Sequence, residues 1–265
     1  MTEWNAHNYN RQSTLQQVMA EEQLALLTLN GDDRILDVGC GDGKITAEVA
    51  NRVPRGSVLG TDPSKDMIAF AASHFTGPKY ANLRFEVADV RRMPYRNEFD
   101  LIISFNALHW VPEQSEALDC LRAAIKPQGR VLLRFVSQGS RTSLEDVIEQ
   151  TRKLPQWANY FPGYRKPYLH LTPAEYQTLA NQHGFQVVRL HVNDKAWDFK
   201  TRESFVNFAH ATFVEWTRLV PESDRLAFIT DVLNTYQTIA ATTPEEMNTF
   251  KFYQMEIELK PARIK

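Results

Sequence analysis

Apolar and polar positions follow two alternating periodicities along the first half of the chain. Short apolar runs, typical of buried strands, are separated by segments whose apolar residues recur every three or four positions, as on one face of a helix. Strands that alternate with helices in this way predict an α/β fold, with a mostly parallel sheet and helices on both faces. The first five strands are expected at about 33–38, 57–62, 83–88, 100–105 and 130–135.

The second half is less regular and richer in aromatic residues. Helical spacing at 143–154 and 173–183 flanks a proline-broken segment, 155–168, which predicts a loop. Further on, the pattern predicts a strand at 185–192, helices at about 202–242 and an alternating strand at 252–259. We therefore expect a single domain, 1–265, made of an N-terminal arm and helix (1–30), a ligand-binding core (31–136) and a second half (137–265).

A loop with three alternating glycines follows the first predicted strand. Gly39, Gly41 and Gly43 come directly after the strand that carries Asp37, and a helix begins behind them. Glycine allows positive φ and a close approach of the backbone to a ligand, and a helix start offers unpaired N–H groups. The pattern predicts a nucleotide-type cofactor site at the carboxyl edge of the sheet. A tight strand–helix turn without a ligand is the alternative.

The spacing of the loop argues against a dinucleotide. The dinucleotide fingerprint requires a glycine where this chain has Lys44. Asp62 ends the second strand about 20 residues further on, where a carboxylate can accept hydrogen bonds from ribose hydroxyls. An acid there can instead cap the helix that opens at Pro63.

Asp37 and the three glycines resemble motif I of the class I S-adenosylmethionine-dependent methyltransferases, and the likeness extends over residues 33–136. The resemblance implies a Rossmann-like sheet of seven strands whose last strand is antiparallel, with residues 202–242 inserted between strands 6 and 7. It implies S-adenosylmethionine as the cofactor and S-adenosylhomocysteine as the product. The cofactor-binding residues are expected among Asp37, Gly39, Cys40, Gly41, Gly43, Asp62, Pro63, Met67, Asp89, Val90 and Asn106. For Asp89, a plain turn residue is the alternative.

A narrower resemblance rests on two further stretches. Trp4-Asn5 with Tyr9, and the run Asn106-Ala107-Leu108-His109-Trp110-Val111-Pro112, are similar to the trans-aconitate, juvenile hormone acid and malonyl-carrier-protein methyltransferases. The aromatic helical insertion, to which we assign Trp197, Phe205 and Trp216, is similar too. These enzymes methylate carboxylates, so the resemblance implies O-methylation of a small acid. A phenol, amine or carbon acceptor, a non-catalytic cofactor-binding protein and a dehydrogenase stay open as alternatives.

His109 is the candidate residue for the acceptor chemistry because it follows the fourth strand, at the edge where open α/β sheets bind ligands. It can be a general base, a donor to the substrate or a packed histidine. A carboxylate needs no base at neutral pH, whereas a phenol does. Tyr9, Trp110 and Trp216 are candidate substrate-binding walls. Core packing is the alternative for Trp110 and Trp216, and docking of the N-terminal arm on the surface is the alternative for Tyr9. The basic residues of the second half are expected to be solvated, and one of them can pair with a substrate carboxylate; they are Arg134, Arg141, Arg165 and Lys166.

Composition narrows the choice of partners. The net charge of −2 and the pI of about 6.4 give no basic footprint for nucleic acid, so we expect a small-molecule substrate. No apolar run approaches a membrane span and the N-terminus lacks a signal-peptide pattern, so we expect no membrane partner and a cytoplasmic location. Cys40 and Cys120 have no metal-ligand spacing, and no metal is expected. The sequence leaves the oligomeric state open, and a lid made by the arm and the insertion is a hypothesis.

Overall fold

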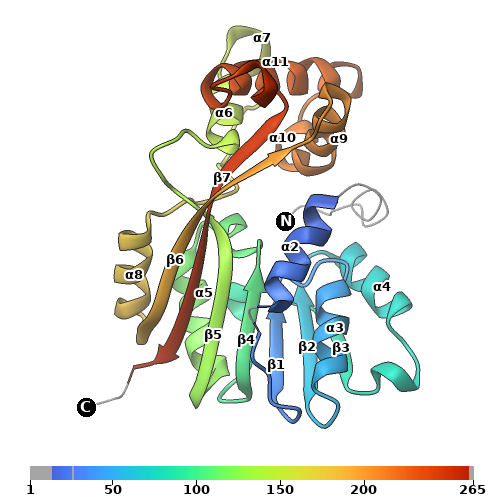
Figure 1. Ribbon diagram of the computed structural model, residues 1–265, viewed down its shortest axis with the longest axis vertical. Helices are drawn as coiled ribbons and strands as arrows, with labels where there is room; N and C mark the ends of the chain where they lie inside the picture. Colours follow the sequence, from blue (N-terminus) through green and yellow to red (C-terminus); the bar gives the residue numbers. More distant parts are fainter. Residues whose placement is uncertain (1–13, 26, 263–265) are drawn as a thin grey trace.

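A computed structural model describes residues 14–25 and 27–262, arranged around one seven-stranded sheet of order β3-β2-β1-β4-β5-β7-β6 (Figure 1). The first five strands pair in parallel, and β7 runs antiparallel to both of its neighbours, β5 and β6. This confirms the predicted Rossmann-like sheet. The strands are β1 (Arg34–Val38), β2 (Ser57–Asp62), β3 (Leu83–Val87), β4 (Phe99–Phe105), β5 (Ile125–Ser137), β6 (Phe185–Asp198) and β7 (Thr249–Pro261).

Helices cover both faces of the sheet because successive side chains of a buried strand point to opposite sides. Ile35 of β1 packs with α3, whereas its neighbour Leu36 belongs to the core formed with α5 and α8. Both positions are fully buried, which explains the nearly continuous apolar runs of the central strands. The helices around the sheet are α2 (Thr14–Ala25), α3 (Lys44–Arg52), α4 (Lys65–His74), α5 (Gln114–Ala124) and α8 (Pro173–Gln182), with short 3-10 turns η1 (Pro78–Tyr80), η2 (Val90–Arg92) and η3 (Leu108–Trp110).

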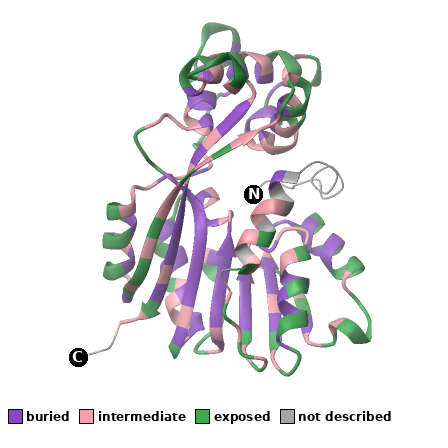
Figure 2. Ribbon diagram, in the orientation of Figure 1, coloured by how far each residue is buried: buried purple, intermediate pink, exposed green. Residues whose placement is uncertain are grey.

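The remaining helices form a separate lobe beyond the carboxyl edge of the sheet, at the top of Figure 1. The ends of β6 and β7 extend into this lobe, whose ribbon includes many buried residues (Figure 2). Buried aromatic and aliphatic side chains form its core. The helical insertion between strands 6 and 7 is therefore present as predicted. The lobe contains α6 (Leu144–Thr151), α7 (Pro155–Ala158), α9 (Arg202–Thr212), α10 (Val214–Thr217), α11 (Glu222–Ala240) and the 3-10 turn η4 (Pro244–Glu246).

Three details of the second half differ from expectation. β6 continues to Asp198 rather than ending at 192, because its polar residues pair with β7 instead of following a burial pattern. Trp197 consequently lies in β6, opposite Phe250, and not in a helix. The segment expected to be a loop contains the short helix α7, which Pro155 begins.

Helix α2 connects the lobe and the core. Leu15, near its start, is buried in the lobe, and Leu24, near its end, packs against the core on the α3 side of the sheet. Tyr9 and the Trp4-Asn5 pair lie outside the described residues. Within the described ranges no helix is both long and apolar enough to cross a bilayer.

Candidate cofactor and acceptor site

The loop after β1 folds back over the sheet edge on its three glycines. Gly39, Gly41 and Gly43 have φ angles of 75°, 53° and 79°, in the left-handed region that other residues rarely adopt. The N–H groups of Gly39 and Cys40 both donate to the carbonyl of Thr61, at 2.7 and 3.0 Å. These bonds tie the loop to β2 and fix its conformation.

The three glycines have different surroundings. A Cβ at Gly39 would lie 2.2 Å from the Cβ of Ala107, and a Cβ at Gly43 would lie 2.7 Å from that of Ala71. These two glycines are required for the packing of the loop. A Cβ at Gly41 would meet no atom within 4 Å. Gly41 therefore marks the side of the loop that faces open space, where a ligand can approach the backbone.

Asp62 is oriented by the same loop. The Gly41 N–H donates to its Oδ2 at 3.1 Å and the Ser64 N–H to its Oδ1 at 2.9 Å. The residue that caps α4 is Ser64, whose hydroxyl accepts from the N–H of Met67 at 3.3 Å. The capping alternative for Asp62 is therefore wrong, and its carboxylate is placed where the loop and β2 meet. Pro63 beside it is exposed, and the Met67 side chain is buried.

Asp37 is buried beneath the loop and accepts a 2.7 Å hydrogen bond from the Thr46 hydroxyl. Burial raises the pKa of its carboxyl to about 7, and the charge of Asp62 acts in the same direction. A cationic group bound beside Asp37 would favour its ionised form. The residue thus fits the positively charged end of a cofactor.

Asp89 follows β3 and caps the turn η2, accepting the Arg91 N–H at 3.0 Å. The Arg91 guanidinium also binds its carboxylate, with Nε 2.9 Å from Oδ1. Hydrogen bonding and charge from Arg91 lower the pKa of Asp89, so the group is ionised at neutral pH. The next side chain, Val90, is buried in the core.

Asn106, directly after β4, has a φ of 55°, a strained conformation that is concentrated at functional sites. Its N–H donates to the carbonyl of Arg134 at 2.6 Å, and its Oδ1 accepts from Gln254 Nε2 at 3.0 Å. Since β4 lies beside β1, these bonds hold Asn106 next to the glycine loop.

His109 lies in the turn η3 and is 4% exposed. Burial lowers the pKa of its imidazole well below the usual range, and the neighbouring His170 adds to the effect. The two rings are 5.9 Å apart between centroids. Among the described residues, His109 Nδ1 and both ring nitrogens of His170 have no hydrogen-bond partner.

An aromatic cluster lies beside the two histidines. The ring of Trp110 is 6.2 Å from that of Tyr168 and 5.9 Å from that of Trp216. Trp216 is 1% exposed and donates its indole N–H to Glu149 at 2.8 Å, whereas Trp110 is only partly buried. Trp110 is therefore more accessible than Trp216, the other predicted substrate-binding wall among the described residues.

Residues 35–129 match a family model described as a methyltransferase domain. The match begins in β1 and includes the glycine loop, Asp62, Asp89 and His109. The chain carries a methyltransferase domain. It is of the class I, S-adenosylmethionine-dependent type.

Several relatives of this methyltransferase are methyltransferases by name. A chain of Invertebrate iridescent virus 6 named methyltransferase 235L is 28% identical over 88% of this chain and 85% of its own. The trans-aconitate 2-methyltransferase of Variovorax paradoxus is 36% identical over 51% of each chain. The juvenile hormone acid O-methyltransferase of Drosophila melanogaster is 29% identical over 64% of this chain and 60% of its own.

Solved structures share the fold of this methyltransferase. One is a methyltransferase-like protein of Bacillus halodurans C-125, with a TM-score of 0.65 at 15% identity, covering 92% of this chain and 99% of its own. Another is phosphoethanolamine N-methyltransferase 2 of Haemonchus contortus, bound to S-adenosylhomocysteine, with a TM-score of 0.61 at 17% identity, covering 94% of this chain and 53% of its own.

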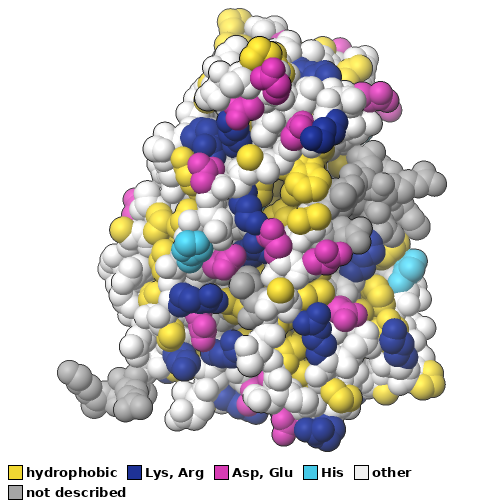
Figure 3. Space-filling view, in the orientation of Figure 1, with side chains coloured by type: hydrophobic (Ala, Val, Ile, Leu, Met, Phe, Trp, Pro, Cys, Tyr) yellow, Lys and Arg dark blue, Asp and Glu magenta, His cyan; other side chains and the backbone are white. Residues whose placement is uncertain are grey.

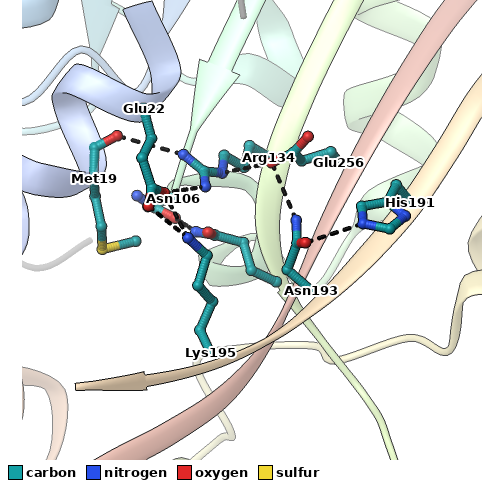
Figure 4. Close-up of polar contacts among 9 residues, drawn as sticks. Met19, Glu22, Asn106, Arg134, His191, Asn193, Lys195 and Glu256 are labelled. Carbon is teal, nitrogen blue, oxygen red and sulfur yellow. Dashed lines mark hydrogen bonds and ion pairs between the residues drawn. The ribbon is translucent and has the colours of Figure 1, made fainter. Parts of the chain in front are cut away.

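The expectation that Arg134 is solvated is wrong. Its side chain is buried, with Nη2 2.6 Å from Glu22 of α2 and Nε 3.3 Å from Glu256 of β7 (Figure 4). Lys195 of β6 also binds Glu22, at 2.7 Å. Glu22 is separated from Arg134 by 112 positions in the chain, so no local pattern reveals the pairing.

Sequence reasoning also missed His170. It stands between Leu169 and Leu171, just before the helix cap Thr172, in a stretch too short to show a helical or strand periodicity. Its significance depends on the fold, which brings it next to His109.

On the face of the methyltransferase shown in Figure 3, acidic and basic side chains are interspersed over both the core and the lobe.

Proposed function

We propose that this methyltransferase methylates a carboxylate oxygen of a small acid. The observation that carries the proposal is the environment of His109. It is buried in the turn that follows β4, the neighbour of β1 in the sheet, its pKa is lowered, and its Nδ1 has no acidic partner in the described part of the chain. A histidine in this state is a weak base.

The pKa values decide between acceptors. A phenol has a pKa of about 10, so transferring its proton to this imidazole would be uphill by more than roughly three pKa units. Effective general bases have pKa values near the working pH and an ionised partner that stabilises the imidazolium. A carboxylate is already ionised at neutral pH. It needs only to be held in line and shielded from water.

The residues of this chain would promote the reaction by positioning the cofactor and the carboxylate relative to each other. When bound, S-adenosylmethionine supplies a methyl group on a positively charged sulfur. Asp62 would bind the ribose hydroxyls, Asp37 the cationic amino-acid end, and Asp89 with the Val90 N–H the adenine edge. Trp110 would close the acceptor side. Alignment of this kind contributes on the order of 7–11 kcal/mol to a bimolecular transfer.

The names of two relatives also support a carboxylate as the acceptor. The Variovorax enzyme is named for trans-aconitate and the Drosophila enzyme for juvenile hormone acid, both of them carboxylic acids. Their identities to this chain are 36% and 29%, over 51% and 64% of it, so they support the acceptor class and not a particular acid.

The test is a substrate panel of aliphatic and aromatic carboxylic acids, phenols and amines. S-adenosylhomocysteine formation would be measured, and the products would be identified by mass spectrometry and treated with mild alkali. We expect products that alkali cleaves, because methyl esters hydrolyse and aryl ethers and N-methyl groups do not. Turnover confined to phenols or amines would contradict the proposal. So would a His109→Ala variant whose kcat falls 100-fold and recovers at high pH. Cofactor binding without turnover on any acceptor would favour a non-catalytic role.

A further inference from the structure

We propose that His109 and His170 together bind the acceptor carboxylate, each through one imidazole N–H. The inference rests on the proposed function and adds to it a specific recognition group. It concerns how the acid is held, and it includes a residue outside the matched methyltransferase region, which ends at residue 129.

Buried ring nitrogens of the two histidines lack hydrogen-bond partners among the described residues. A neutral imidazole has one N–H donor and one acceptor nitrogen. Both nitrogens of His170 are buried without a partner among the described residues, so its N–H lacks an acceptor in either tautomer. His109 Nδ1 also has no partner among these residues, and in the tautomer that carries the proton there it offers a second unpaired N–H. The two residues are only 7% and 4% exposed, and buried polar groups are normally paired. A ligand that brings acceptor oxygens would satisfy both.

The fold holds the two imidazole rings close to each other. The N–H of Leu169 donates to the carbonyl of His109 at 2.8 Å, which ties the His170 segment to η3. On the other side, the Gln138 N–H donates to Leu171 at 3.0 Å. The His170 ring also lies 4.6 Å from that of Tyr168, whose hydroxyl donates to Asp146. His170 is thus held in place from three directions.

Three of the four basic side chains predicted as candidates for pairing with a substrate carboxylate are already bound to carboxylates of the protein. Arg134 is paired with Glu22 and Glu256, Arg141 with Asp194, and Lys166 with Asp146. Each of these basic side chains has a protein carboxylate as its partner. Arg165 is exposed to solvent.

Neutral donors also suit the reaction. A cation paired with the acceptor oxygen would hold its electrons and weaken it as a nucleophile. A carboxylate bound by two uncharged N–H groups in a water-excluded site is oriented while keeping its nucleophilic character. Burial lowers the pKa values of both imidazoles, so both are uncharged at neutral pH.

The decisive variant is His170→Phe, which keeps a ring and removes both nitrogens. With the best acid from the panel, we expect KM to rise roughly 10- to 100-fold, the range for a hydrogen bond to a charged group. S-adenosylmethionine affinity and thermal stability should stay near wild type. His170→Asn retains a donor and should recover most of the loss. His109→Phe combined with His170→Phe should cost less than the product of the single effects, because both contact one carboxylate.

A second readout separates binding from a structural role. The primary amide of the same acid would be measured as a competitive inhibitor. The wild type should prefer the acid, and His170→Phe should lose that preference. His210→Phe, at an exposed position of α9, is the matched control and should change neither value.

The outcomes distinguish the two proposals. If the wild type methylates no carboxylic acid, the proposed function fails and this inference fails with it. If it methylates acids and His170→Phe binds them as tightly as wild type, only the inference fails. A parallel loss of acid and amide affinity would also overturn it, since that would indicate a packing role.

Discussion

The cofactor core and the helical lobe build their sites in different ways. In the core, the loop after β1, Asp62 and Asp89 follow three neighbouring strands, and backbone groups hold them in place. In the lobe and the adjoining turn, rings from distant parts of the chain pack together at the proposed acceptor site, such as Trp110 with Trp216. The proposed cofactor site is therefore encoded locally, whereas the proposed acceptor site depends on long-range packing.

Substitutions in the two regions should accordingly have separable effects. Changes in the glycine loop should affect cofactor binding and leave the lobe intact. Changes around His170 should affect the acceptor and leave the cofactor. Helix α2 is the exception, because it contacts both regions and is bound to the sheet through Glu22.

The largest expected effect is that of Arg134→Met. It leaves Glu256, which is 7% exposed, without its guanidinium partner, and removes the bond to α2. Breaking a buried ion pair from one side costs about 3–5 kcal/mol, to be measured by chemical denaturation. Arg165→Met, at an exposed position, should change stability by less than about 0.5 kcal/mol. Equal losses in the two variants would show that α2 is not anchored by this cluster.

Next comes Gly39→Ala, which tests whether the loop is packed as described. The new Cβ would lie 2.2 Å from the Cβ of Ala107 at a φ of 75°. Overpacking together with a left-handed alanine should cost roughly 2–5 kcal/mol. Thermal unfolding would measure the loss. A variant with wild-type stability would mean that the β1 loop and the turn after β4 are not in close contact.

Asp37→Asn should alter the pH dependence of stability in the cofactor-free protein. The pKa of Asp37 is raised to about 7, above its ordinary 3.8, so the folded protein holds this proton more tightly than the unfolded chain. Its contribution is present at low pH and is lost as pH rises from about 4 through 7. Tm measured from pH 5 to 8 should fall less steeply in the variant.

Asp100→Asn is a control of opposite sign. Hydrogen bonds and charge from Lys126 and Arg34 outweigh the effect of burial and lower the pKa of Asp100. Its stabilising contribution is lost as pH falls and should not alter the slope above pH 5. An identical slope in Asp37→Asn and the wild type would contradict a raised pKa at Asp37.

The smallest effect is expected from Thr172→Ala. Thr172 and Glu175 form a reciprocal capping box at the start of α8, two residues after His170. Loss of the capping box should lower the free energy of unfolding, measured by denaturant titration, by about 1 kcal/mol. It should also raise the KM of the acid slightly, with no change in cofactor affinity. A shift in cofactor affinity would indicate that the two sites are coupled through α8.

The difference between the regions also explains what the sequence reveals. The order of strands and helices, the glycine loop and Asp62 are contiguous features with a fixed period or spacing, and the structure agrees with them. The full length of β6 depends on its pairing with β7, as at Lys195 and Phe252, which no periodicity shows. The burial of Arg134 and the meeting of His109 with His170 result from contacts across more than 60 positions, so they required the fold.

Gly41→Ala tests most directly that the cofactor binds against the glycine loop. A Cβ there meets no protein atom within 4 Å, so the variant should fold with only the roughly 1–2 kcal/mol cost of a left-handed alanine. The side-chain methyl group of the new alanine would project into the space that the cofactor is proposed to occupy. Calorimetric titration with S-adenosylmethionine should show affinity lower by roughly 5- to 100-fold than wild type. Unchanged affinity in a folded Gly41→Ala protein would contradict this placement of the cofactor.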